Sequence, residues 1–349
     1  MSEPVRVGLN GFGRIGRNVF RASLEHDGVE IVAINDVMDE DDVEYLATYD
    51  TVMGRLDGVS LDDGVLTVEG TDFQAGVFSE TDPRQLPWDE LDVDVAFEAT
   101  GIFRTYDEAS KHLDAGADKV VISAPPKGDK PVKQLVYGVN HDEYDGENVV
   151  SNASCTTNSI TPVAKVLDEA FGIESGQLTT VHAYTGSQSL IDGPKAKTRR
   201  GRAAAENIVP TSTGAAQAAT EVLPELDGKL DGMAIRVPVP NGSITEFVVS
   251  LEADVTEAEV NAALETAAAG DLAGVLGVTN DQVVSSDIVG QPYSSYVDLS
   301  STTVVNGLVK VLTWYDNEYG FSNRMLDMAT FVTDSAPNPS ERIATPADD

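Results

Sequence analysis

The chain is poor in cysteine and histidine. One cysteine, Cys155, and four histidines occur among 349 residues. A single cysteine permits no intrachain disulfide, which is typical of a protein from a reducing compartment. The histidines are scattered without the spacing of zinc ligands, so we predict no metal site. There is no run of about 18 apolar residues, and the start MSEPVRVGLNG lacks an apolar signal core. We therefore expect a cytoplasmic protein.

Basic residues are also few. The chain has 23 Lys and Arg against 58 Asp and Glu, a net charge of −35. So negative a surface repels phosphate backbones and anionic lipids, so we expect no nucleic-acid or membrane partner. Concentrated salt screens the self-repulsion, since the Debye length falls to about 3 Å at 1 M. The composition favours adaptation to a salty cytoplasm over an ordinary acidic protein.

What the chain does have is a nucleotide-binding pattern near its start. Residues 5–10 form an apolar run of strand length, residues 15–24 have helical apolar periodicity, and residues 30–35 form a second strand-like run. Between the first strand and the helix stand three glycines with G-x-G-x-x-G spacing, Gly11, Gly13 and Gly16. The pattern predicts the first βαβ unit of a dinucleotide-binding fold.

Each residue of this pattern has a physical task. Gly11 permits the tight turn, Gly13 lets the backbone approach a pyrophosphate, and Gly16 allows close helix packing. Asp36 follows the second strand, where its carboxylate accepts hydrogen bonds from the ribose hydroxyls and repels a 2′-phosphate. The predicted cofactor is therefore NAD rather than NADP. Further strand-like runs at residues 94–99 and 119–123 lead into turns at the same edge of a parallel sheet.

Cys155 lies in an unusual setting for a lone thiol. The stretch SNASCTTNSI surrounds it with small polar side chains, and residues 160–171 continue as an amphipathic helix. The cysteine is thus predicted near a helix N-terminus, where the partial positive charge and free N–H groups stabilise a thiolate. A packing cysteine is usually surrounded by apolar residues. We predict a nucleophile.

A nucleophilic thiol needs a base. His26, His112 and His141 lie in acidic segments and are predicted to be ordinary surface residues. His182 lies instead in QLTTVHAYTGSQ, a strand-like run directly after the cysteine helix. That strand returns the chain towards Cys155, so we predict that His182 is the catalytic base.

Positive charge is concentrated in one segment, KAKTRRGR at residues 195–202. In so acidic a chain it is predicted to serve an anionic ligand or a subunit contact rather than to be a solvated loop. Arg236 lies within a strand-like apolar run, where an unpaired guanidinium is costly. Either a bound phosphate or a buried carboxylate would compensate it.

Several motifs together resemble one family. NGFGRIGR, SNASCTTN, TTVHAYT, TSTGAA, RVPVPN and WYDNEYGFSNR occur in the order and spacing of glyceraldehyde-3-phosphate dehydrogenases of the bacterial and eukaryotic type. The resemblance runs from about residue 4 to about residue 333. It implies an α/β fold, with an N-terminal Rossmann NAD-binding domain and an α+β catalytic domain whose sheet is mainly antiparallel.

The resemblance also implies domain bounds and site residues. The expected NAD-binding domain is 1–153, completed by a C-terminal helix at about 318–335; the catalytic domain is 154–317, and 336–349 is a polar tail. Cys155 and His182 match the nucleophile and base. Cofactor contacts match Gly11, Gly13, Arg14, Ile15, Gly16, Asp36, Ser123 and Asn317. Substrate and phosphate contacts match Ser154, Thr156, Thr185, Thr213, Gly214 and Arg236.

The implied reaction is oxidation of glyceraldehyde 3-phosphate to 1,3-bisphosphoglycerate, with reduction of NAD and uptake of inorganic phosphate, in glycolysis or gluconeogenesis. It proceeds through a hemithioacetal and a thioester on the cysteine. The basic segment matches one that reaches a neighbouring subunit, which implies a homotetramer.

Other functions stay open on the sequence. An erythrose-4-phosphate dehydrogenase would use the same cysteine and histidine on a longer aldehyde. A non-catalytic NAD-binding regulatory protein would have no need of a reactive thiol, and a hydroxy-acid dehydrogenase would leave Cys155 idle.

Overall fold

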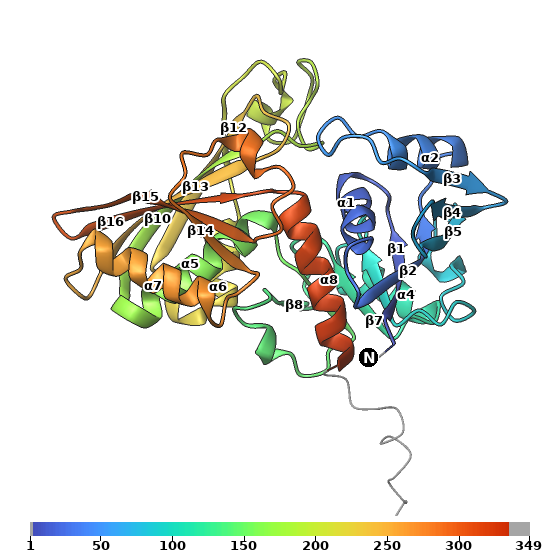
Figure 1. Ribbon diagram of the computed structural model, residues 1–349, viewed down its shortest axis with the longest axis horizontal. Coiled ribbons are helices and arrows are strands. Elements are labelled where there is room, and N and C mark those ends of the chain that lie inside the picture. The colour runs from blue at the N-terminus through green and yellow to red at the C-terminus, as the bar shows by residue number, and fades with distance from the viewer. Residues whose placement is uncertain (1–2, 335–349) are drawn as a thin grey trace, which may run out of the picture.

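The computed structural model describes residues 3–334, which form two β-sheets with helices packed on them (Figure 1). The strands of the first sheet are β1 (Val5–Asn10), β2 (Val29–Asn35), β3 (Val59–Asp62), β4 (Val65–Val68), β5 (Gln74–Phe78), β6 (Val95–Glu98), β7 (Lys119–Ile122), β8 (Lys133–Gln134) and β9 (Val149–Ser151). Its helices are α1 (Arg14–Ser23), α2 (Glu40–Thr48), α3 (Tyr106–Ala109) and α4 (Lys111–Asp114).

The first sheet is a Rossmann-type sheet. Its strand order is β3-β4-β5-β2-β1-β6-β7-β9-β8, parallel from β5 to β8, with β3 and β4 antiparallel at one edge. The chain runs from β1 through α1 to β2 on one side, whereas β6 pairs with the other side of β1. The strand order therefore reverses between β1 and β6, and a crevice at this reversal is where α/β sheets bind ligands.

The second sheet is mainly antiparallel. Its strands are β10 (Ile173–Ala183), β11 (Val209–Ser212), β12 (Leu230–Val237), β13 (Ser243–Leu251), β14 (Leu276–Thr279), β15 (Ser295–Val305) and β16 (Leu308–Tyr315). They lie in the order β11-β12-β10-β13-β16-β15-β14, and only the β10–β12 and β14–β15 pairs among these are parallel.

Helices cover one face of this second sheet. They are α5 (Cys155–Phe171), α6 (Ala215–Val222) and α7 (Glu257–Ala269), which lie together below the strands in Figure 1. Burial alternates strictly along β13, from buried Ser243 to buried Leu251. This alternation is typical of a sheet with one face on a core and the other open. Residues 3–334 of a single chain leave that second face of the sheet uncovered.

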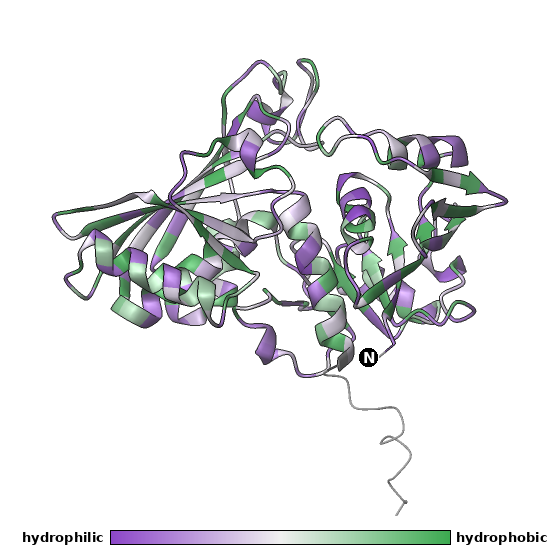
Figure 2. Cartoon of the chain, viewed as in Figure 1, coloured by the Kyte–Doolittle hydropathy of each residue, from purple (hydrophilic) through white to green (hydrophobic). Residues whose placement is uncertain are grey.

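Helix α8 (Tyr319–Asp334) returns from the second sheet to the first, where it packs beside α1 (Figure 1). The apolar side of α8 is buried in the first core: Phe321, Met325, Leu326, Met328, Ala329 and Val332 pack with residues of β1, β2, β6 and β7. A separate core lies between the second sheet and helices α5 to α7. In Figure 2 the outer helix α2, which begins with three acidic residues, is largely hydrophilic.

The predicted fold class is confirmed: a Rossmann sheet is followed by an α+β unit with a mainly antiparallel sheet. The polar tail predicted at 336–349 lies outside the described residues. In the described part of the chain, no helix combines the length and the apolar character needed to cross a membrane.

Candidate active site

Cys155 is the first residue of helix α5. The chain leaves β9 through Asn152 and Ala153, and Ala153 has the left-handed φ of 55°. Ser154 caps the helix, its hydroxyl oxygen accepting a hydrogen bond from the Thr157 N–H at 3.1 Å. A non-glycine residue with positive φ costs about 1–3 kcal/mol and is often found where a turn must aim a functional group. Here the turn presents the thiol at the positive end of a 17-residue helix.

His182 reaches this thiol from β10. Its Nε2 lies 3.5 Å from Sγ of Cys155, although 27 positions separate the two residues. Its Nδ1 lies 2.7 Å from the carbonyl oxygen of Ala183. When Nδ1 donates its hydrogen there, Nε2 presents a lone pair to the thiol, which is the tautomer that a base requires.

Strand pairing brings Arg236 to the same place. In the parallel pair of β10 and β12, His182 lies opposite Arg236. Nη1 of Arg236 is 3.0 Å from Nδ1 of His182, and it donates to the Ala183 carbonyl at 3.0 Å and to Oγ1 of Thr185 at 3.4 Å. The guanidinium thus competes with the Ala183 carbonyl for Nδ1.

The electrostatics of the pair follow from burial and positive charge. Burial lowers the pKa of His182 to about 3, and the charges of Arg236 and Arg200 add to the lowering. Burial likewise raises the pKa of the Cys155 thiol, while Arg236, the Thr156 hydroxyl and the N–H groups of Thr156 and Cys155 oppose that rise. In the unliganded site the pair is therefore a thiol and a neutral imidazole.

Arg236 needs an anion. Of the residues that the structure describes, those that its guanidinium contacts are His182, Ala183 and Thr185, and no carboxylate is among them; Nε has no hydrogen-bond partner. Burial lowers the pKa of Arg236, and the charge of Arg200 lowers it further. The sequence left two partners open for Arg236, a bound phosphate or a buried carboxylate. Among the described residues, no carboxylate contacts its guanidinium.

The glycine loop lies at the carboxyl end of β1, beside the strand-order reversal. Gly11 has φ of 101°, and a Cβ there would lie 2.6 Å from the backbone nitrogen of Thr100. A Cβ on Gly16 would lie 2.0 Å from the Gly11 carbonyl oxygen, so the helix packs directly on the loop. A Cβ on Gly13 would meet no described atom within 4 Å, so the backbone there is open to a ligand. These features fit a dinucleotide pyrophosphate.

Asp36 holds the same loop from the next strand. Its Oδ2 accepts a hydrogen bond from the Phe12 N–H at 2.6 Å, and its Oδ1 accepts one from the Met38 N–H at 3.2 Å. Arg14, at the start of α1, forms ion pairs with Asp50 and with Glu318. Although burial alone would lower it, these pairs raise the pKa of Arg14 above its usual value. They also tie the glycine loop to the start of α8.

Asn317 is held in one orientation. Its Oδ1 accepts a hydrogen bond from the Ser243 hydroxyl at 2.7 Å, and that hydroxyl oxygen accepts one from the Ala183 N–H at 3.1 Å. Among the described residues, the amide NH₂ of Asn317 is therefore the side left for a ligand. Ser243 links the residue beside His182 to the predicted nicotinamide contact.

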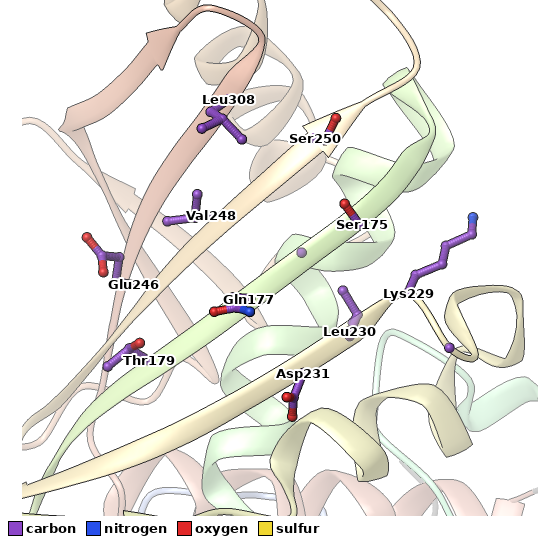
Figure 3. Close-up of a pocket in the computed structure, with 12 residues that line it drawn as sticks. Ser175, Gln177, Thr179, Lys229, Leu230, Asp231, Glu246, Val248, Ser250 and Leu308 are labelled. Atoms are coloured by element: carbon purple, nitrogen blue, oxygen red, sulfur yellow. The ribbon is translucent and has the colours of Figure 1, made fainter.

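A cavity of about 280 Å³ joins the two halves of the site. Its lining includes Arg14, Ile15, Ser123, Ser154, Cys155, His182, Thr185, Arg236 and Asn317. All of these are predicted site residues, and they come from both halves of the chain. Larger hollows lie elsewhere: one of about 520 Å³ on the open face of the second sheet (Figure 3) and one of about 870 Å³ between α5 and α7. Neither contains the cysteine.

Three of the predicted substrate and phosphate residues lie outside this lining. Thr156 is buried, with its hydroxyl 3.0 Å from the Tyr315 hydroxyl. Thr213 and Gly214 precede α6, where Oγ1 of Thr213 accepts a hydrogen bond from the Ala215 N–H at 3.1 Å. The basic segment lies beside them, since Arg200 bonds to Thr211 and Ser212.

One histidine prediction is wrong. His112 is fully buried rather than on the surface, because α4 turns it inwards against the first sheet. His26 and His141 are partly exposed. Sequence reasoning missed Ser243 and Tyr315 as neighbours of the site, whereas Arg200 lies in the basic segment that it did single out. Within residues 3–334, no group of three or more His, Cys, Asp and Glu side chains is arranged to hold a metal ion.

Comparisons with known proteins agree with this geometry. Residues 5–106 match the family model of the glyceraldehyde 3-phosphate dehydrogenase NAD binding domain, and residues 154–317 match that of its C-terminal domain. The chain is 80% identical to the glyceraldehyde-3-phosphate dehydrogenase of Haloarcula vallismortis, a halophile, over 96% of this chain and all of that protein. The enzymes of that name from Streptomyces coelicolor and Geobacillus stearothermophilus are 55% and 52% identical, each over 94% of this chain and 98% of the relative. The chain therefore belongs to the glyceraldehyde-3-phosphate dehydrogenase family.

Proposed function

We propose that Cys155 and His182 carry out the family's reaction in this chain, the NAD-dependent oxidation of glyceraldehyde 3-phosphate to 1,3-bisphosphoglycerate. The observation that supports it best is the 3.5 Å contact between Sγ of Cys155 and Nε2 of His182. The cavity around this contact is also lined by Arg236 and by the predicted cofactor residue Asn317. The cavity thus brings the thiol, the proposed phosphate-binding arginine and the proposed nicotinamide contact together.

The first step forms a bond between the Cys155 sulfur and the aldehyde carbon. The thiol proton passes to Nε2 of His182 and from there to the carbonyl oxygen, which becomes the hydroxyl of a hemithioacetal. Nε2 of His182 accepts the proton of that hydroxyl as a hydride leaves the carbon. NAD, when bound, supplies the acceptor for this hydride. The product on the cysteine is a thioester.

The second step releases the product. An oxygen of inorganic phosphate attacks the thioester carbon, the C–S bond breaks, and the leaving thiolate takes the proton that His182 accepted in the first step. Arg236 and Thr185 hold the phosphate of the substrate. Ser154, Thr156, Thr213 and Gly214 provide the inorganic phosphate site. Thr156 contributes from its backbone, since its hydroxyl contacts Tyr315.

On the cofactor side, Gly11, Gly13, Arg14, Ile15 and Gly16 form the pyrophosphate end of the site. Asp36 binds the adenine ribose, and Ser123 and Asn317 contact the nicotinamide half. The NH₂ of Asn317 fits a carboxamide carbonyl, because Ser243 already occupies its oxygen.

The domain division that we propose follows the two sheets. Residues 1–153, with the helix at about 318–335, form the NAD-binding domain, and residues 154–317 form the catalytic domain. The packing of α8 beside α1 supports this division.

A homotetramer would cover apolar surface that the single chain exposes. Leu190, Ile191 and Ile208 flank the basic segment and are 83%, 77% and 70% exposed. The open face of the second sheet carries Leu230, Val248 and Leu308 among polar residues of β10, β12 and β13 (Figure 3). Exposed apolar patches of this kind are typical of subunit contacts. Sedimentation in concentrated KCl tests the proposal, and a monomer would contradict it.

We place the enzyme in the cytoplasm.

Absorbance of NADH tests the reaction. In concentrated KCl, glyceraldehyde 3-phosphate with NAD should be oxidised only slowly until inorganic phosphate is added. Cys155→Ser should abolish turnover and leave NAD binding intact. Erythrose 4-phosphate is run alongside, and a preference for it would replace the proposed substrate. NAD binding without any turnover would favour a non-catalytic role.

A further inference from the structure

A buried carboxylate lies beneath the glycine loop and has no part in the chemistry proposed above. Glu98 is the last residue of β6 and is 1% exposed, and His112, its neighbour from α4, is 0% exposed. Glu98 lies at the strand-order reversal between β1 and β6. Burying an ionised carboxylate is costly unless hydrogen bonds satisfy it. The hydrogen bonds around Glu98 therefore indicate what it does.

On one side of Glu98 the hydrogen bonds have a fixed direction. Nε1 of Trp88 is 3.0 Å from Nδ1 of His112, and an indole N–H is able only to donate. Nδ1 of His112 therefore accepts, so its hydrogen is on Nε2. That Nε2 lies 3.2 Å from Oε2 of Glu98 and donates to it. The tautomer of His112 is set by Trp88.

On the other side the direction is fixed as well. Nδ2 of Asn10 donates to Oε2 of Glu98 at 2.7 Å, and Nδ2 of Asn35 donates to Oδ1 of Asn10 at 2.7 Å. Asn35 is held in this orientation by the backbone of Glu80, whose N–H donates to Oδ1 at 2.8 Å and whose carbonyl accepts from Nδ2 at 3.0 Å. If the amide of Asn10 or of Asn35 were flipped, its oxygen would face another acceptor oxygen and its NH₂ would face another N–H donor.

The second carboxylate oxygen receives two more donors. Oε1 of Glu98 accepts a hydrogen bond from the Thr100 N–H at 2.9 Å and one from the Thr100 hydroxyl. Glu98 thus accepts four hydrogen bonds, and three of their donors have no means of reversing. A carboxyl group, which has two oxygens, matches these donors, whereas an amide with one acceptor oxygen does not.

Two loops meet at this carboxylate. Asn10 directly precedes Gly11 of the glycine loop, and Thr100 lies in the loop after β6. The loops are in direct contact, since a Cβ on Gly11 would lie 2.6 Å from the Thr100 nitrogen. Glu98 bonds to both loops, to the first through Asn10 and to the second through Thr100.

We propose that Glu98 is a positioning residue for the cofactor: it fixes the spacing of the Gly11 and Thr100 loops that form the floor of the dinucleotide site. Trp88 and His112 hold its carboxylate in place. This inference rests on the proposed NAD site at Gly11 and Gly13. It also gives a task to His112, the buried histidine whose predicted place was the surface.

Glu98→Gln tests the role without changing the size of the side chain. A glutamine has one acceptor oxygen, so its NH₂ must oppose either the Thr100 N–H or the donors of Asn10 and His112. A buried donor left unsatisfied costs about 1–3 kcal/mol. We expect NAD to bind at least about tenfold more weakly, equal to about 1.4 kcal/mol. The alkylation rate of Cys155 without NAD should not change, because the thiol lies in the other half of the site.

Trp88→Phe supplies a readout specific to this network. It removes the donor at Nδ1, so His112 is free to change tautomer, and its Nε2 is then able to accept a hydrogen bond from the amide that Glu98→Gln introduces. We expect Trp88→Phe alone to weaken NAD binding less than Glu98→Gln does, because Glu98 keeps its bonds from Asn10 and Thr100. The double variant should lose at least about threefold less affinity than the product of the two single losses. Two independent losses of packing would multiply in the double variant instead.

Two results would overturn the inference: NAD affinity of Glu98→Gln within about twofold of the wild type, or losses from Glu98→Gln and Trp88→Phe that simply multiply in the double variant. If Glu98→Gln does not fold, Glu98→Asp decides. It keeps the charge but is too short to reach Asn10 and Thr100 together, so wild-type affinity in that variant also overturns the inference. A wild type that binds no NAD would instead refute the proposed function.

Discussion

Neutralising Arg236 should raise the pKa of His182. In the unliganded enzyme this pKa is about 3, lowered first by burial and next by the charge of Arg236. The perturbation is Arg236→Gln, which keeps a hydrogen-bonding amide and removes the charge. A substrate phosphate bound to Arg236 should act in the same direction, because its negative charge offsets the guanidinium.

The size of the effect follows from the geometry. Nη1 of Arg236 is 3.0 Å from Nδ1 of His182, and the guanidinium charge is centred somewhat farther away. At about 4 Å and an effective dielectric constant of about 20, two unit charges repel by about 4 kcal/mol. At about 1.4 kcal/mol per pH unit, that is an upper limit of about 3 units. Burial persists in the variant, so we expect a rise of about 1–2 units.

A higher pKa at His182 has a consequence for catalysis. A neutral His182 is available as a base at every pH above its folded pKa, but with a value of about 3 it accepts a proton poorly. A rise brings it towards the neutral range, where proton transfer from Cys155 or the hemithioacetal is more favourable. Binding of the substrate phosphate would thus both draw Arg236 away from Nδ1 and strengthen the base.

Histidine C2-hydrogen exchange followed by mass spectrometry measures the pKa of His182. Four histidines keep the assignment simple, and the Cys155→Ser background removes proton exchange with the thiol. His182 should show no titration above about pH 5 in the parent, and should titrate at higher pH in Arg236→Gln or with glycerol 3-phosphate. Arg199→Gln is the matched control, since Arg199 is exposed in the same basic segment as Arg200.

Two results would refute this account of His182. A titration near the ordinary histidine pKa of 6.5 in the unliganded parent would mean that burial and Arg236 have no net effect. Equal values in Arg236→Gln and Arg199→Gln would mean that the charge of Arg236 contributes nothing.

Three further predictions concern the cofactor side and the surface. Asp36→Asn should weaken NAD binding about tenfold and reduce the preference of the enzyme for NAD over NADP, because the ribose and the Phe12 N–H both lose a carboxylate acceptor. Calorimetric titration with each nucleotide measures both affinities, and an unchanged ratio of the two would contradict the role of Asp36. Ser243→Ala frees the Asn317 amide to rotate, so the KM for NAD should rise several-fold, about 1 kcal/mol, with a smaller change in kcat; equal losses in both would indicate a defect in chemistry instead. The melting temperature should rise between dilute and concentrated KCl, since salt screens the net charge of −35; a salt-independent midpoint would count against salt adaptation.

Local patterns predicted the parts of the site that depend on local structure. Gly11, Gly13 and Asp36 are placed by one βαβ unit, and Cys155 by a cap and a helix start, so spacing along the chain was sufficient. The partnership of His182 with Arg236 depends on the parallel register of β10 and β12 across 54 positions. Nothing in either segment specifies that register, so the sequence alone left phosphate and carboxylate equally open for Arg236.

His112 shows where charge misled the prediction. Lys111 precedes it and Asp114 follows two positions later, but residues this close in sequence point to different faces of a helix. Ala109 lies three positions earlier and is fully buried, so the i, i+3 pattern placed His112 on the inner face. The flanking charged residues only describe the outer face of α4. Whether a histidine in an acidic segment is buried should therefore be predicted from the helix face on which it lies, and not from the charge of the residues next to it in sequence.

The two buried histidines also show how direction in a hydrogen-bond network decides function. Nδ1 of His112 faces Trp88, which fixes one tautomer permanently, and that suits a residue whose task is to hold Glu98 still. Nδ1 of His182 faces both the Ala183 carbonyl and Arg236, which favour opposite tautomers. Of these two histidines, only His182 has two states available, and the group that selects between them is the one proposed to bind the substrate phosphate. The imidazole proposed to exchange a proton is thus the one whose partners favour no single tautomer until substrate is bound.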